Sequence, residues 1–149
     1  MRYFAISLLS FIFALAQAAP VVNSHTIKWK ACDRWENNGV VQKIVAFENA
    51  RYLSGDLLPH FFVSIPLEDD NQSYKVEIKN AVYIPLTSEE TEVLSGATFQ
   101  SEASLDSYAV TRDGYRVLDV HILPFVAKEQ SVLKLISFDL SIEKDETIH

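Results

Sequence analysis

The chain has 149 residues, one cysteine and a formal net charge of −7, and 48% of its residues are hydrophobic. This length suits one domain with a core that needs no metal, and a single cysteine excludes a disulfide within the chain. The acidic balance argues against a nucleic-acid-binding protein, because such proteins present basic residues to the phosphates. The apolar content is too high for an intrinsically disordered chain.

The first 18 residues are typical of a signal peptide for export. Arg2 gives a positive start, residues 6–15 are almost wholly apolar, and residues 16–18 (Ala-Gln-Ala) have the small-x-small form of a cleavage site. The apolar run is shorter than the about 20 residues of a membrane-spanning helix, so a retained anchor is the weaker alternative. No later stretch resembles it, and we expect no transmembrane segment after cleavage. The expected organisation is a signal peptide (1–18), a linker (19–26), one domain (27–143) and a polar tail (144–149).

Past residue 19, apolar and polar residues alternate with a period of two, which is typical of half-buried strands. In the last of these segments, Phe138 and Leu140 share one face and Asp139 and Ser141 the other. Asp113-Gly114, between two such segments, is a strong signal for a two-residue β-hairpin turn. The strands expected are 27–31, 41–47, 60–65, 74–79, 82–86, 108–112, 115–125 and 136–143, with Ile136 on the core face, a turn at 37–39 and a bend at Asn80.

One segment has helical character. Thr87 and Glu90 have the Thr-x-x-Glu spacing of a capping box, which predicts about two helical turns from residue 87. No long helix alternates with the strands, so nothing indicates a parallel sheet. The pattern therefore predicts an all-β fold, an antiparallel β-sandwich. The strand over 131–143 is long and apolar, and we expect it to be central or covered.

The residue types that carry catalysis give little support to an enzyme. Cys32 is the one thiol, and Lys30 and Arg34 would lower its pKa, but the simpler interpretation is a small residue at a strand end. The four histidines are scattered, and the sequence has no Gly-x-Ser-x-Gly elbow and no glycine-rich phosphate loop. We therefore predict no catalytic residue and no cofactor.

Metal binding has equally little support. Residues 69–73 resemble the opening of a calcium loop, but Tyr74 and Asn80 stand where that loop needs glycine and glutamate. The acidic cluster at 68–70 is better interpreted as a solvated loop. We therefore predict no metal site.

The tip of the Asp113-Gly114 hairpin is the candidate contact surface. Arg112, Tyr115 and Arg116 surround the turn, and arginine and tyrosine are the residues that dominate protein interfaces. The alternative is an ordinary solvated hairpin. Most of the other aromatic residues have the parity of core positions, although a carbohydrate or peptide groove is a second use for them.

Several segments, taken in order, resemble a known family. They are Ala46–Ala50, Leu58–Phe61, Ile65–Leu67, Val82–Leu86, Val120–Phe125 and Val132–Leu140. Their order and spacing resemble the N-terminal region of the type IX secretion system sortase, the PorU-type, gingipain-like cysteine peptidase of Bacteroidetes. The match spans roughly residues 27–143.

The resemblance implies a prodomain-like β-sandwich placed ahead of a peptidase domain, which carries the catalytic cysteine and histidine and is absent here. The parent enzyme would cleave C-terminal sorting domains and attach cargo to the cell surface. The partners implied are the peptidase domain of the same polypeptide or a related protease, and outer-membrane secretion components. The chain would be exported to the periplasm or the outer-membrane surface.

Two other functions stay open. The first is an inhibitory prodomain of a gingipain-like protease, in which Arg112 or Arg116 would lie in the protease cleft. The second is a stand-alone secreted β-sandwich for adhesion or carbohydrate binding. Association with a peptidase domain, and its effect on the rate, would discriminate among the three. A reading frame that continues past His149 into a peptidase would favour the first function.

Overall fold

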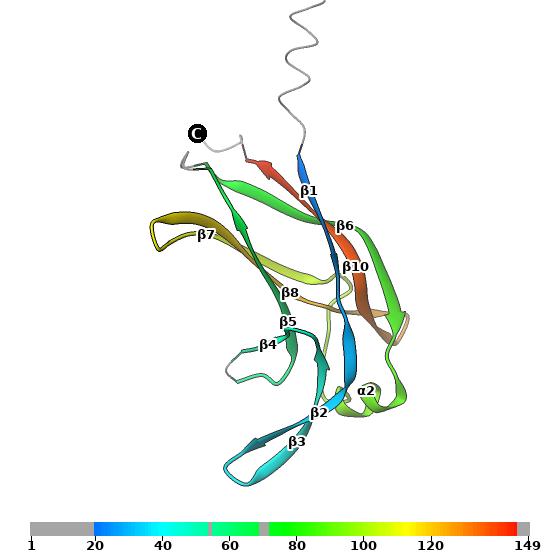
Figure 1. Cartoon of the computed structure of the whole chain (residues 1–149). Coiled ribbons are helices and arrows are strands. Elements are labelled where there is room, and N and C mark those ends of the chain that lie inside the picture. The colour runs from blue at the N-terminus through cyan, green and yellow to red at the C-terminus, as the bar shows by residue number, and fades with distance from the viewer. Residues whose placement is uncertain (1–19, 54, 69–71, 146–149) are drawn as a thin grey trace, which may run out of the picture.

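The computed structural model describes residues 20–53, 55–68 and 72–145. The predicted signal peptide, most of the polar tail and the central part of the calcium-like loop lie outside these residues. The described residues form ten strands and one short helix (Figure 1). The elements are β1 (Val21–Thr26), β2 (Trp29–Asn37), β3 (Val40–Phe47), β4 (Arg51–Tyr52), β5 (Pro59–Pro66), β6 (Tyr74–Pro85), α2 (Ser88–Val93), β7 (Ser104–Arg112), β8 (Tyr115–Leu123), β9 (Phe125–Lys128) and β10 (Ser131–Lys144).

The last strand, β10, is the centre of the first sheet. It pairs antiparallel with β6 along one edge and, along the other, with β9 at its start and β1 further on. A strand with neighbours on both sides has no backbone groups left for another chain, which removes the aggregation hazard of a long apolar edge. The prediction that this strand is central is confirmed.

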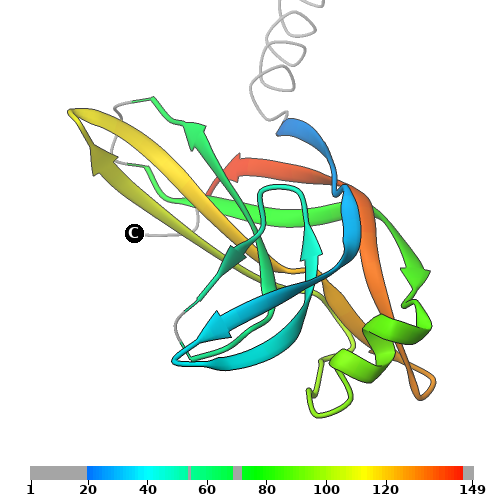
Figure 2. The ribbon, with the colours of Figure 1, turned by 60° about the horizontal axis from the view of Figure 1, so that its bottom comes forward.

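The second sheet has the order β4-β5-β8-β7 and is also antiparallel. It faces the first sheet, and the hairpin of β2 and β3 extends beyond the end of the two layers (Figures 1 and 2). The predicted all-β antiparallel sandwich is therefore confirmed.

The core lies between the two sheets, where alternate residues of the central strands point inward. Leu118, Val120 and Ile122 of β8 meet Phe138 and Leu140 of β10, and each is at most 2% exposed. A smaller apolar cluster lies where α2 packs near β3. Its buried members are Val45, Leu94, Phe99 and Phe125. Burial of such side chains stabilises the fold by about 1.5–3 kcal/mol each.

Three expectations about the strands are wrong in detail. Val21–Thr26, which we assigned to a linker, forms β1. The pairing of β10 with β6 shifts between Leu135 and Ser137, so Leu135 is fully buried in place of Ile136, which is half-buried. The two strands expected at 74–79 and 82–86 are one continuous strand, β6, in which Asn80 is a left-handed residue (φ 52°) at an irregularity of the pairing.

Candidate functional site

The predicted hairpin joins β7 and β8. Asp113 and Gly114 both have positive φ (53° and 80°), as a two-residue turn of this kind requires, and Arg112 pairs with Tyr115 across it. Tyr115 is 75% exposed, so its ring is available to a partner. The hairpin tip extends away from the two-layered core (Figure 1).

Arg112 forms an ion pair along the hairpin. Its guanidinium donates to both carboxylate oxygens of Asp119, and the Ser64 hydroxyl donates to Asp119 Oδ1 at 2.6 Å. Asp119 is only 7% exposed. The Arg112 hydrogen bond, with a smaller contribution from Ser64, holds the pKa of the Asp119 carboxyl below its usual value, against the effect of burial. The three side chains therefore connect β5, β8 and β7 near the tip.

Arg116 lies on the opposite face of the sheet from Tyr115, because neighbouring strand residues alternate. Its Nη2 donates to the carbonyl oxygen of Gln72 at 2.7 Å, and its guanidinium carbon lies 5.9 Å from the centre of the Tyr74 ring. The structure therefore brings Arg112 and Tyr115 together on one face and directs Arg116 toward the start of β6.

The outward face of the β4-β5-β8-β7 sheet, which we call the open face, carries a row of rings. The guanidinium carbon of Arg51 lies 3.5 Å from the centre of the Phe62 ring. The centres of the Phe62 and His121 rings are 4.7 Å apart, and the centres of the His121 and Tyr108 rings are 6.5 Å apart. Tyr108 is 56% exposed and is not a core residue. Its parity with the polar Asp106 and Arg112 is the sequence signal that indicates this.

A pocket of about 230 Å³ lies on the open face, near the end of the sheet where the short strand β4 pairs with the start of β5. Its polar lining includes His60, whose Nε2 is 3.3 Å from Asp56 Oδ2. The pocket was not predicted, because its residues come from four separate segments. They are Leu53, His60, Ser104, Asp106, Tyr108, His121 and Leu123.

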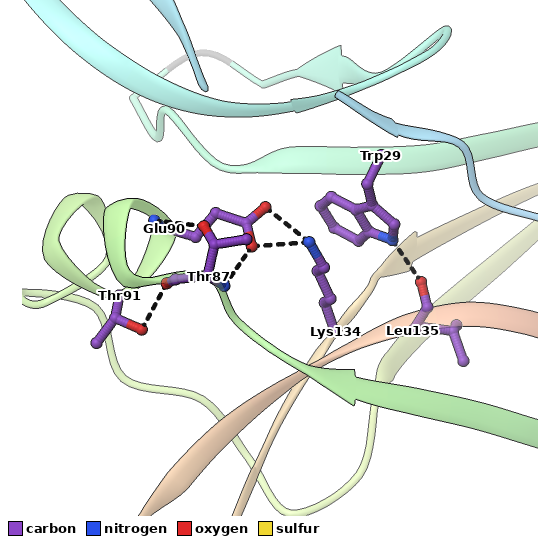
Figure 3. Close-up of polar contacts among 6 residues, drawn as sticks. All are labelled: Trp29, Thr87, Glu90, Thr91, Lys134 and Leu135. Carbon is purple, nitrogen blue, oxygen red and sulfur yellow. Dashed lines mark hydrogen bonds and ion pairs between the residues drawn. The ribbon is translucent and has the colours of Figure 1, made fainter. Parts of the chain in front are cut away.

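A second polar cluster connects α2 to β10 (Figure 3). Lys134 Nζ lies 2.7 and 2.9 Å from the two carboxylate oxygens of Glu90, and both side chains are almost fully buried. Lys134 Nζ also lies 5.0 Å from the ring centre of Trp29, whose indole N–H donates to the Leu135 carbonyl. The cluster fixes the helix against the first sheet.

The predicted capping box is confirmed. The Glu90 backbone N–H donates to the Thr87 hydroxyl at 3.1 Å, and the Thr87 N–H donates to Glu90 Oε1 at 2.8 Å. Glu90 therefore caps the helix and pairs with Lys134 at once. Lys134 was not predicted, because its position within an apolar run gives no sign of a partner 44 residues away.

Cys32 lies within β2, beside a register shift against β3, and not at a strand end as expected. Burial raises the pKa of its thiol, and the Glu89 and Glu90 carboxylates raise it further. The expectation that Lys30 and Arg34 lower this pKa is therefore wrong. In the described part of the chain, no three histidine, cysteine, aspartate or glutamate side chains are grouped as a metal would need.

The described helix is too short and too polar to cross a bilayer. The fold class is thus an antiparallel sandwich of two sheets with an extended hairpin and an open face. No known protein family and no curated protein matches the sequence.

Two solved structures share this fold. The first is the complex of Porphyromonas gingivalis RgpB pro- and mature domains, with a TM-score of 0.55 and 12% identity, over 87% of this chain and 84% of the matched chain. The second concerns the zymogenic latency of gingipain K from Porphyromonas gingivalis, with a TM-score of 0.50 and 10% identity, over 84% of this chain and 93% of the matched chain. At these identities the likeness is one of fold.

Proposed function

We propose that this chain is a prodomain-like module that packs on a gingipain-like cysteine peptidase and keeps it latent. The observation that carries the proposal is the shared two-sheet fold, which spans most of this chain and most of both matched chains. One of those structures is a complex of pro- and mature domains, and the other concerns zymogenic latency. With the predicted signal peptide, the module would act outside the cytoplasm.

The tip of the β7–β8 hairpin is the contact surface that we propose. Tyr115 is exposed, while Arg112 is held by Asp119 and Arg116 by the Gln72 carbonyl. Side chains that are already ordered lose little entropy when a partner binds. The tip therefore offers a tyrosine on a pre-organised hairpin, which suits a buried anchor of an interface.

The direct test is inhibition of a gingipain-like peptidase domain from the organism that encodes this chain. The purified chain should slow hydrolysis of a chromogenic peptide, and Tyr115→Ala should weaken that inhibition at least tenfold, as expected for an interface anchor worth about 2 kcal/mol. Unchanged inhibition by Tyr115→Ala would contradict the proposed surface. Tight binding without slower hydrolysis would contradict latency.

Tyr108→Ala is the matched control. Tyr108 is also an exposed tyrosine of the same sheet face, but it pairs with Asp119, four residues along β8 from Tyr115. At about 3.4 Å per residue, the two side chains are roughly 14 Å apart along the strand. Tyr108→Ala should therefore leave inhibition unchanged.

The finer candidate is the N-terminal domain of a type IX secretion system sortase, which the order of sequence segments favours. In that case the module assists its own peptidase domain and outer-membrane secretion components, at the periplasmic or surface side. Tight association with the sortase peptidase domain, without loss of its activity, would support this candidate over the inhibitory one.

A further inference from the structure

We infer that the pocket on the open face binds one unit of a neutral saccharide. The pocket of about 230 Å³ is smaller than the roughly 300–1,000 Å³ of sites for drug-sized ligands, so it suits a single small ring. It is separate from the Arg112–Tyr115 tip, because its β7 residues, Ser104, Asp106 and Tyr108, lie in the half of that strand away from the turn, up to its middle.

Apart from His60, the polar side chains that line the pocket have no hydrogen-bond partner among the described residues. The side chains of Ser104, Asp106, Tyr108 and His121 make no hydrogen bond or ion pair with another described residue. Asp106 can only accept when ionised, the two hydroxyls donate and accept, and a neutral imidazole does one with each nitrogen. A ligand with several neighbouring hydroxyl groups, each both donor and acceptor, matches this mixture.

The pocket also has apolar walls. The rings of Tyr108 and His121 meet at an angle of 70°, so they form two sides of a corner, and Leu53 and Leu123 complete the lining. The C–H face of a pyranose is apolar and flat enough to pack against the exposed Tyr108 ring. The pocket thus combines an aromatic platform with polar groups around it, as a sugar site requires.

The charges around the pocket favour a neutral ligand. The Asp106 carboxylate in the lining disfavours an anion. The guanidinium of Arg51 does not line the pocket, but it lies on the Phe62 ring, which contacts the lining residue His121, so it adds a positive charge to the same face and partly offsets the charge of Asp106. His60, another titratable lining residue, lies 3.3 Å from the Asp56 carboxylate. A sugar hydroxyl that donates to Asp106 forms a charge-assisted hydrogen bond without bringing a charge of its own.

The test is a titration of the ¹⁵N-labelled chain with methyl glycosides of glucose, galactose, mannose and N-acetylglucosamine. At least one should shift amide signals at 104–108 and 121, with a Kd on the order of 1 mM. Asp106→Asn and Tyr108→Ala should each weaken that binding at least tenfold, and Tyr115→Ala should leave it unchanged. Binding is read without any peptidase, so this result is independent of the proposed latency function.

Three outcomes would overturn the inference. One is the absence of shifts with all four glycosides at tens of millimolar. Another is binding that survives both Asp106→Asn and Tyr108→Ala. The third is a stronger response to arginine methyl ester at the same amide signals, which would make the pocket a cation site.

Discussion

At the scale of single residues, the buried Glu90–Lys134 pair is a charged contact inside an apolar fold. Removing two charges from water is costly, and the cost is offset only when the charges meet each other and further partners. Glu90 accepts from both Lys134 and the Thr87 N–H, and the ammonium lies near the Trp29 ring. Removal of either residue would therefore leave the other charge buried without its partner.

Lys134→Met should be strongly destabilising. It leaves the Glu90 carboxylate buried without its counter-charge, which costs about 3–5 kcal/mol of unfolding free energy, measured by urea denaturation. Adding Glu90→Gln to Lys134→Met should restore part of the stability, because the amide oxygen still accepts from Thr87. The control is Lys43→Met, whose ion pair with Glu89 is exposed and is worth about 0–1 kcal/mol. A loss below 1 kcal/mol for Lys134→Met would contradict this account.

Predictability from sequence at this scale depends on distance along the chain. The capping box needs only Thr87 and Glu90, three residues apart, and the sequence predicted it correctly. The partner of Lys134 is set by how α2 packs on the first sheet, and no local pattern contains that information. The open-face pocket was missed for the same reason.

At the scale of elements, β1 is one of the strands that sequence periodicity did not reveal. Its core-facing residues include Asn23 and His25, whereas Val21 and Val22 are exposed. The segment therefore lacks the usual alternation of apolar inward and polar outward residues, and it forms a strand through its pairing with β10. The hairpin of β7 and β8 was predicted because Asp113-Gly114 and the alternation of β8 are local signals that agree.

His25 should make the stability of the fold depend on pH. The centre of its ring lies 5.4 Å from that of Phe61 and 5.5 Å from that of Phe138. Burial lowers the pKa of His25, although the Asp139 carboxylate raises it in part. The unfolded chain, with an ordinary histidine pKa of about 6.5, then binds the proton more readily. The free energy of unfolding should therefore fall as pH drops from about 6.5 to the lowered value.

The measurement is urea denaturation at a series of pH values between about 7 and 5. His25→Phe keeps an aromatic ring between Phe61 and Phe138 but does not titrate, so its stability should change less with pH over this range. Equal pH dependence for the two proteins would show that His25 does not cause the effect.

At the scale of the whole molecule, composition and alternation were enough for the fold class but not for the order of strands. In residues 138–142, apolar residues alternate with polar ones, which predicted two facing layers, and the burial of Phe138, Leu140 and Ile142 in the core confirms them. Which strands become neighbours is decided by packing between distant segments, such as β1 with β10. The irregularities in the β6–β10 pairing also arise there, which is why Ile136 was assigned to the wrong face.

Removal of residues 20–26 should expose one edge of β10. The six residue pairs from Val21–Ile142 to Thr26–Ser137 are lost, and with net values of about 0.5–1.5 kcal/mol for each backbone hydrogen bond we expect a loss of at least about 3 kcal/mol. Urea denaturation would measure the loss, and light scattering should detect association through the free edge. A synthetic peptide of residues 20–27, added in trans, should reverse both effects. An unchanged unfolding midpoint would contradict this role of β1.

The position of β10 has a consequence for how the protein is made. Along the chain β10 comes after β1 and β6, so these two strands lack their common neighbour until β10 is synthesised. The first sheet can therefore close only once β10 has emerged from the ribosome, and until then β1 and β6 keep their backbone groups unpaired on the side that β10 will occupy.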